Sequence, residues 1–493
     1  MSAPILILLI AIPLLRPLRS PDPRLISDDE QARLATVQAI VEHGSQAIEG
    51  TEFRDTRDII VSKADVSSPF PSHVYSKQPP MMALLLSGPY WLMHRAGLSF
   101  SRDSSTVIFW LTLIGVTIPV SIAGGLVYRM SKTFELKRPL RALLAVTVVL
   151  GSGLISYATT LNAHAPAATL LLAAASCLIH VIFHNVPRRA APWLASAGFF
   201  AALAATIDPP AIAFLLPLIL VVGAFRWPIG MRTAGLLAYA LGAALPIVVH
   251  AQLVRPITGD LRPGMFHSEL AVAPRVPQSM PWSGASLTSS VCAVSAPGHS
   301  AVGDTSALAG SNSPDDDDEP HTRWRAFLHG AWRILGSFLG KHGVFSHFPI
   351  VVLGILGVSL IMHRHWPAAT KMLAGGTLGG ALAVIVVYAL CRSSTRDAMF
   401  ATRWFVVFLP LTLFWAGAWL RRSHRRSSWI MAGALLAFSV TASLIGATGP
   451  LPRGGFSHYT VAGAWHNLMD HPQPPPALLS PVADRGGQEA FSE

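Results

Sequence analysis

Apolar runs of about 20 residues alternate with short polar segments along most of this chain. Because a transmembrane helix needs about 20 mostly apolar residues, each run predicts one membrane span. A shorter apolar stretch at 1–15 reads as a first helix. Together the runs predict an all-α polytopic membrane protein with about eleven transmembrane helices. The later runs are 106–128, 140–160, 165–184, 191–207, 209–225, 233–252, 345–362, 371–391, 403–420 and 428–447.

Residues 79–94 form an apolar segment of a different kind. The segment begins with two prolines and ends at a His-Arg pair, so it is too short to cross a bilayer. We expect a juxtamembrane helix that lies flat in the interface, with Tyr90 and Trp91 at the level of the headgroups.

The basic residues of the short loops fix the predicted orientation. If 79–94 lies flat, all of the short basic loops fall on one side of the membrane. The positive-inside rule assigns that side to the cytoplasm. The loops 16–105 and 253–344 and the Pro-rich tail 448–493 then face outward, around the two span groups 106–252 and 345–447. The stretch 277–320 is rich in Ser, Gly, Ala and Pro and predicts disorder. The cytoplasmic basic residues are Arg129, Lys132, Lys137, Arg138, Arg141, Arg188, Arg189, Arg226, Arg232, Arg364, Lys371, Arg421, Arg422, Arg425 and Arg426.

Composition agrees with this pattern and excludes one class of partner. The 493 residues are 51% hydrophobic and 13% charged, whereas soluble domains carry about 25% charged residues. The net charge of +11 could suggest nucleic-acid binding, but the basic residues are divided among short clusters between apolar runs. That distribution indicates membrane topology, so no nucleic-acid partner is expected.

The first polar segment, "LISDDEQARLATVQAIVEHG" at 25–44, opens with three carboxylates. Ser27 followed by Glu30 is the pattern of a capping box, and acids in the first turn suit the helix dipole. A helix start could be their whole role. Alternatively, one of Asp28, Asp29 and Glu30 accepts a proton from a poorly nucleophilic hydroxyl beside the membrane.

A lysine precedes the interfacial segment in "HVYSKQPPMMALLL". At this depth the ammonium group of Lys77 could pair with the phosphate of a lipid. Ordinary snorkelling toward headgroups would explain the same position.

These motifs, taken in order, resemble the GT-C glycosyltransferases, and in particular bacterial aminoarabinose and lipopolysaccharide-sugar transferases and protein O-mannosyltransferases. The shared features are the acidic pair after the first span, the "Y-x-K-x-P" entry to a juxtamembrane helix, and the expected number of spans. "TTLNAHAPAATLLL" at 159–172 and "FATRWFVVFLPLTLF" at 400–414 add two further matches, and the resemblance covers most of 20–420.

The resemblance implies roles for particular residues. Asp29 would be the base for the acceptor, with Glu30 and Asp28 as alternates. Lys77, with Arg33 and Arg403, would bind the donor phosphate. Many members carry an acid in the outward loop where this chain has "NAH". That missing acid argues against a divalent-metal site, and no cofactor is implied. Candidate substrate contacts are Tyr75, Asn162 and His164.

The resemblance therefore implies a transferase of the cytoplasmic membrane with an outward-facing site. It would move a sugar from a polyprenyl-phosphate donor to a lipid, glycan or protein acceptor, in contact with membrane lipids. The alternative is a secondary transporter or lipid flippase. A transporter predicts ionisable groups in mid-span, whereas here they cluster at span ends, with His180 and His250 as the main exceptions.

Overall fold

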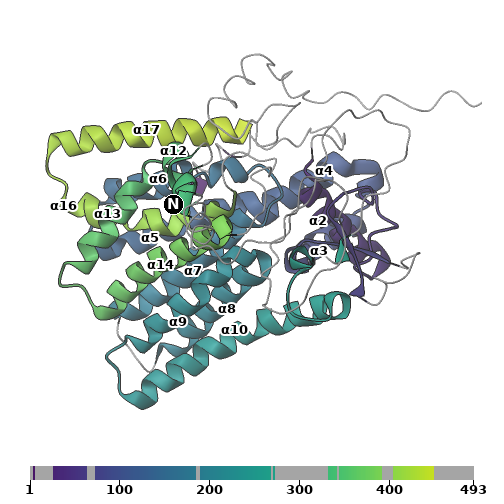
Figure 1. Cartoon of the computed structure of the whole chain (residues 1–493), viewed down its shortest axis with the longest axis horizontal. Helices are drawn as coiled ribbons and strands as arrows, with labels where there is room; N and C mark the ends of the chain where they lie inside the picture. Colours follow the sequence, from purple (N-terminus) through teal and green to yellow (C-terminus); the bar gives the residue numbers. More distant parts are fainter. Residues whose placement is uncertain are drawn as a thin grey trace, which may run out of the picture.

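The computed structural model describes residues 4–5, 11, 26–63, 73–184, 189–267, 270–271, 331–332, 334–340, 343–390 and 403–448. Helices make up most of this part, together with one small antiparallel sheet (Figure 1). Most of the expected first helix at 1–15, the expected disorder at 277–320 and almost all of the tail at 448–493 lie outside the described residues.

The described elements are mainly α-helices, connected by short π and 3₁₀ segments. The α-helices are α2 (Asp28–Gln38), α3 (Pro80–Arg95), α4 (Phe100–Thr112), α5 (Ile118–Met130), α6 (Arg138–Gly151), α7 (His164–His184), α8 (Ala191–Ile207), α9 (Leu215–Gly223), α10 (Ile229–Thr258), α12 (Val344–His347), α13 (Val351–Met362), α14 (Ala368–Leu390), α15 (Leu409–Phe414), α16 (Ala416–Arg422) and α17 (Arg426–Thr448). The π and 3₁₀ segments are η2 (Ala39–His43), η4 (Leu113–Thr117), η5 (Ser131–Phe134), η6 (Ile155–Tyr157), η8 (Pro209–Phe214), η9 (Gly264–Phe266) and η11 (Arg403–Val407). Strands β1 (Ile59–Val61) and β2 (Val74–Ser76) pair with Ile60 opposite Tyr75.

Five helices in the described part are long and apolar enough to cross a membrane, or six if a pair bent by 100° counts as one span. The predicted total of about eleven is therefore matched only in part. Several of the other predicted runs form shorter or interrupted helices. Pro209 and Pro210 begin η8, and 403–420 divides into η11, α15 and α16. Proline suits a first helical turn and has no amide to bond to the preceding turn, which favours breaks at such positions.

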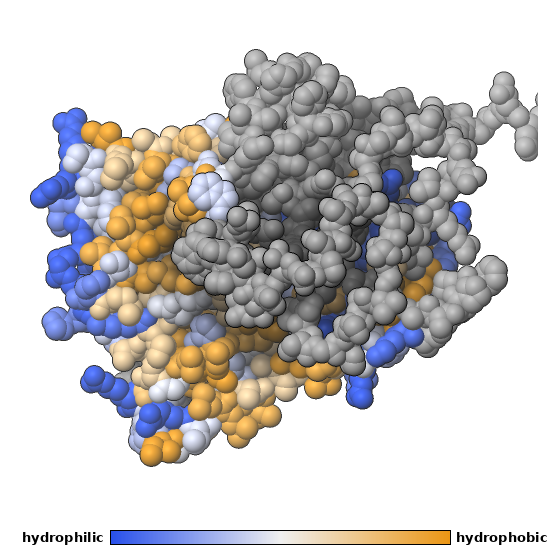
Figure 2. All heavy atoms as spheres, in the orientation of Figure 1, coloured by the Kyte–Doolittle hydropathy of each residue, from blue (hydrophilic) through white to orange (hydrophobic). Residues whose placement is uncertain are grey.

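The long helices pack side by side, and their apolar faces point outward between two polar ends. Exposed leucines such as Leu237, Leu241 and Leu245 follow one face of α10. Figure 2 shows hydrophobic residues over this flank and hydrophilic residues along the left edge, where α16 meets α17. Contiguous exposed apolar surface bounded by polar ends is expected of a protein embedded in lipid.

A smaller unit of α2, α3 and the β1–β2 hairpin lies at the end of the bundle opposite the turn between α16 and α17 (Figure 1). Leu34 and Val37 are fully buried, and the other residues of α2 from Glu30 to Gln38 are buried with them. Gly44 ends this segment at φ 66°, a left-handed conformation that glycine adopts readily.

The helix predicted within 79–94 is present as α3. Only one of its two aromatic residues has the exposure that was predicted. Trp91 is exposed, as expected for a side chain at headgroup level. Tyr90 is fully buried, packs against Phe100 and donates a hydrogen bond to Glu42. The prediction for Tyr90 was wrong because local periodicity did not reveal that η2 would cover this face of α3.

Candidate functional site

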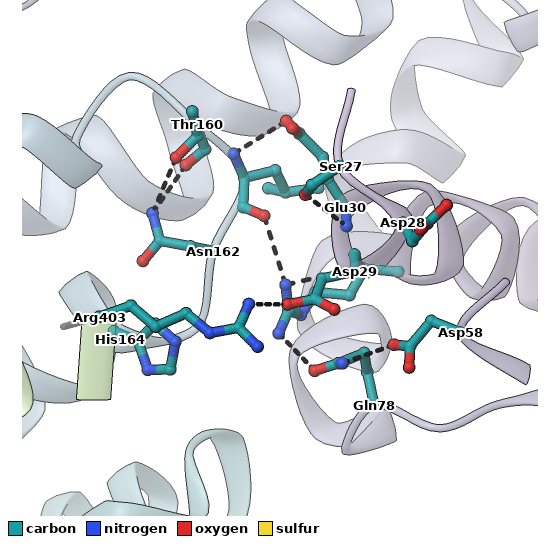
Figure 3. A network of polar contacts seen from close by, with 12 residues as sticks. Ser27, Asp28, Asp29, Glu30, Asp58, Gln78, Thr160, Asn162, His164 and Arg403 are labelled. Carbon is teal, nitrogen blue, oxygen red and sulfur yellow. Dashed lines mark hydrogen bonds and ion pairs between the residues drawn. The ribbon is translucent and has the colours of Figure 1, made fainter. Parts of the chain in front are cut away.

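The acidic start of α2 is a capped helix terminus, as the sequence pattern predicted. Ser27 has extended backbone angles, and its hydroxyl accepts a hydrogen bond from the Glu30 amide at 3.2 Å. The cap fixes the direction in which each following side chain points. In Figure 3, Asp29 points toward Arg403, whereas Asp28 points away from this pair. The Ser27 half of the predicted capping box is therefore confirmed, and it leaves Asp29 available for a further role.

Asp29 and Arg403 form an ion pair between segments 374 residues apart in the sequence. Their side chains are only 19% and 17% exposed, so the pair is partly shielded from water. Burial favours the neutral form of Asp29, but the nearby charges of Arg403 and Arg33 outweigh it. The pKa of Asp29 consequently lies below the usual value for aspartate.

A second polar chain links α2 to the hairpin. Arg33 is buried and donates to the side-chain oxygen of Gln78 at 2.6 Å, and the Gln78 amide donates to Asp58 at 2.5 Å. Burial and the charge of Asp29 raise the pKa of Asp58 to about 6, against the opposing effects of Gln78 and Lys77. Asp58 was missed at the sequence level, because no motif distinguishes an acid before a three-residue strand.

Lys77 lies beside this chain and is buried, with 7% of its surface exposed. Its backbone is held on both sides, because its amide donates to the Asp58 carbonyl and its carbonyl accepts from Met265. Within the described ranges, the Lys77 ammonium group forms no hydrogen bond or ion pair. Buried lysines are normally paired, so an unpaired one marks a place where an anion could bind.

Glu30 and Asp28, the alternates to Asp29, have different surroundings. Glu30 is buried and accepts a hydrogen bond from the Leu161 amide at 3.0 Å, which ties α2 to the segment before α7. Asp28 is exposed, and its carbonyl accepts from Thr56. Glu30 therefore has a structural contact that Asp29 lacks, and Asp28 faces outward from the network.

The two predicted contacts at the start of α7 separate into a helix cap and a histidine–carboxylate pair. The Asn162 side chain accepts from the Ala165 amide at 3.0 Å and donates to the Thr160 carbonyl at 2.9 Å, so it shapes the helix start. His164 Nδ1 lies 2.7 Å from Asp208, and both side chains are buried. Asp208 thus supplies, from the end of α8, a carboxylate beside the loop in which the sequence shows none.

Tyr75 lies in β2, beside a small cavity. With Thr36 and Gln78 it lines a small cavity of about 20 Å³, large enough for water rather than for a sugar. No group of three or more His, Cys, Asp or Glu side chains is arranged to hold a metal ion anywhere in the described part of the chain.

Comparison with known proteins gives matches only among solved structures. No family model matches the sequence, and no curated protein matches it. The fold is similar to the oligosaccharyltransferase of Archaeoglobus fulgidus in its apo form, with 13% identity and a TM-score of 0.46, over 92% of this chain and 57% of that one. The archaeal oligosaccharyltransferase AglB from Archaeoglobus fulgidus, in complex with an inhibitory peptide and a dolichol-phosphate, gives 12% identity, a TM-score of 0.48 and coverage of 92% and 56%.

The chain thus spans little more than half the length of the solved structures it matches. They are structures of a glycosyltransferase, the class that the sequence motifs resemble. A function for this chain must therefore rest on the contacts of the site itself rather than on this likeness.

Proposed function

We propose that this protein is a membrane glycosyltransferase that moves a sugar from a polyprenyl-phosphate-linked donor to a lipid, glycan or protein acceptor. The observation that carries the proposal is the arrangement of Asp29, Arg403 and Lys77. A carboxylate and its arginine partner lie at one end of an apolar helical bundle, and the buried Lys77 of the same unit lies close enough to Asp28 and Asp58 to act on their charge. Such an end is where a lipid presents its phosphate.

On the donor side, two cations have complementary roles. Lys77 offers an ammonium group as a point charge, and Arg403 offers a planar guanidinium that can bind two phosphate oxygens. Arg33 lies behind them and is already engaged with Gln78, so it supplies charge rather than a direct contact. The prenyl chain of the donor would lie among the apolar helices.

Donor binding would also change the state of Asp29. Arg403 pairs with Asp29 in the structure, and a phosphate would compete for the same guanidinium. Phosphate bound there would neutralise the charge that holds the pKa of Asp29 down, so the carboxylate becomes a stronger base. The ion pair would then couple donor binding to the basicity of Asp29 toward the acceptor hydroxyl.

The transfer itself needs one proton acceptor and one leaving group. The acceptor oxygen forms a bond to the anomeric carbon as the bond from that carbon to the phosphate oxygen breaks, with inversion. Polyprenyl phosphate leaves with the electron pair, and Lys77 and Arg403 stabilise its charge. Asp29 orients the acceptor hydroxyl or takes its proton.

A second proton acceptor is available beside Asp29. The Asp208 carboxylate holds His164 at 2.7 Å, and a carboxylate in that position fixes the tautomer and orientation of an imidazole. His164 is also close enough to Asp29 to interact with its charge. The pair could receive the acceptor proton through Asp29 without a metal ion.

The proposal places this site on the outer side of the cytoplasmic membrane. The support is the distribution of cations, because the site lies at the end of α7 opposite the basic loops 129–141 and 421–426. The positive-inside rule assigns such loops to the cytoplasm.

The test is to analyse lipids from a strain that lacks the gene. A polyprenyl-linked sugar should accumulate, and a plasmid carrying the wild-type gene should remove it. Asp29→Asn should fail to remove it at equal expression, whereas Asp28→Asn, the same change one residue away, should succeed. If no lipid-linked sugar accumulates under any growth condition in which the gene is expressed, the proposed donor class is wrong.

A further inference from the structure

A long groove lies between α3, α5, α7 and α8, away from the polar contacts of the site. Its volume is about 780 Å³, and its walls are mainly apolar, with side chains such as Leu86, Leu126, Leu170, Phe200 and Leu203. In a bilayer such a surface is filled by hydrocarbon rather than by water.

The groove runs the length of one membrane-spanning helix. Its lining begins at Pro166, two residues after His164, and ends at His184 on the last turn of α7. A helix of 21 residues is about 30 Å long, which matches the hydrocarbon thickness of a bilayer. One end of the groove therefore lies beside the proposed site and the other in the opposite leaflet.

Cations gather at the end remote from the site. Arg129, Lys132, His180 and His184 all contribute to the lining there. In the part of the chain that the structure describes, neither the Arg129 guanidinium nor the Lys132 ammonium group forms a hydrogen bond or ion pair. Arg129 lines the groove together with His180 and lies close enough to it to interact electrostatically.

Two other basic residues of the same edge, Arg421 and Arg141, are already engaged. Arg421 pairs with Glu135 at 2.6 Å, and Arg141 donates to the Tyr128 carbonyl and stacks on its ring. Trp193 packs on His180 with ring centroids 4.1 Å apart, as aromatic residues do at headgroup level. Two cations without side-chain partners lie at the mouth of an apolar groove. This arrangement suits an anion that carries a hydrocarbon chain.

We infer that this end of the groove binds an anionic phospholipid from the leaflet that faces the 129–141 loop. Arg129 and Lys132 would hold its phosphate, and an acyl chain would follow α7 past Ala173 and Ser176. The donor phosphate cannot serve these cations, because the site lies about 30 Å away at the other end of α7. The inference therefore does not depend on the proposed enzymatic activity.

The experiment uses the full-length protein in nanodiscs of phosphatidylcholine alone or of an equal mixture with phosphatidylglycerol. Native mass spectrometry after extraction should show one retained phosphatidylglycerol and no retained phosphatidylcholine. Arg129→Gln with Lys132→Gln should reduce retention, by roughly fivefold for each cation removed. Arg226→Gln with Arg232→Gln removes the same charge from another basic loop outside the groove and should retain the lipid.

A third variant tests the groove itself. Ala173→Phe narrows its middle without changing any charge, and it should also release the phosphatidylglycerol. Equal retention of both lipids, or equal losses in the two double variants, would overturn specific binding. Retention in Ala173→Phe would overturn the seating of the acyl chain. Because lipid retention is measured without substrate, these results stand apart from the test of glycosyl transfer.

Discussion

The Asp29 carboxylate is subject to two opposing influences. Partial burial disfavours its charged form, while Arg403 and Arg33 stabilise that form more strongly. A carboxylate held this way is a weak base and a firm hydrogen-bond acceptor. The structure without substrate is therefore suited to hold the acceptor hydroxyl in place, and loss of Arg403 to a phosphate would strengthen Asp29 as a base.

Replacing Asp29 separates its chemical role from the helix cap. Asp29→Asn keeps the shape and leaves the Ser27 cap intact, so turnover per folded molecule should fall by roughly 10²- to 10⁴-fold, and the loss of the Arg403 ion pair should lower thermal stability separately. Ser27→Ala should show the reverse, a stability loss of about 1 kcal/mol with near-normal turnover per folded molecule. Single-turnover kinetics and thermal unfolding in detergent measure the two effects. Full turnover in Asp29→Asn would mean that the acidic segment "SDDE" serves only to begin the helix.

Lys77 should act on donor binding rather than on turnover. Lys77→Ala removes a charge-assisted phosphate contact of about 1.5–3 kcal/mol, so the KM for the donor should rise by roughly 10- to 150-fold. Lys77→Arg should restore part of the affinity, because it keeps the charge with a different geometry. The exposed Lys63, replaced by alanine, is the matched control. An unchanged KM in Lys77→Ala would favour a structural lysine.

Asp58 should leave a signature in the pH dependence of stability. Its pKa is about 6 in the folded protein, above the ordinary value of 3.8, so the folded state binds more protons between these values. The contribution of Asp58 to stability is then present at low pH and is lost as the pH rises toward and through 6. Asp58→Asn should flatten the fall in melting temperature between pH 4 and pH 6. An identical pH profile in the variant would mean that Asp58 is not a buried proton-binding group.

Helices α8 and α10 pack closely against each other at two glycines. A Cβ atom on Gly198 would collide with the Tyr239 carbonyl, and one on Gly242 would collide with the Ala195 carbonyl. Backbone carbonyls cannot move aside as flexible side chains can. Small residues at such contacts are a general means of packing helices in membranes.

Substitution at this contact should therefore destabilise the bundle. Gly242→Ala forces the two helices apart and should cost about 1–3 kcal/mol, measured as a lower unfolding temperature in detergent. Gly230→Ala makes the same change in α10 at a position with no atom within 4 Å, and it should leave stability unchanged or slightly higher. Equal melting temperatures in both variants would contradict close packing of α8 on α10.

The sequence was most informative where a feature depends on neighbours along the chain. The cap at Ser27 and the helix within 79–94 both follow from local pattern, and the structure has them. The partners of the site were not predictable in this way. Asp208 reaches His164 from 44 residues away, and Arg403 reaches Asp29 from 374, so only the packing of the bundle brings them together.

At the scale of the whole molecule, polar contacts tie the basic loops to one edge. Arg421 at the end of α16 pairs with Glu135 after α5, and Phe183 near the end of α7 packs against Trp366 between α13 and α14. The α2–α3 unit occupies the opposite end (Figure 1). Because every connection on one edge shares a side of the membrane, a single labelled position on each edge is enough to determine the orientation.

Accessibility to a membrane-impermeant thiol reagent is the measurement. In a background without Cys177, Cys292 and Cys391, Ser427→Cys on the basic edge should react only after the cells are permeabilised. Ser45→Cys beside the α2–α3 unit should react in intact cells, and both positions are exposed, so lack of reaction reports sidedness rather than burial. Labelling of Ser427→Cys in intact cells would mean that the protein has the opposite orientation in the membrane. It would place Asp29 and Lys77 in the cytoplasm, where an outward-facing lipid-linked donor could not reach them.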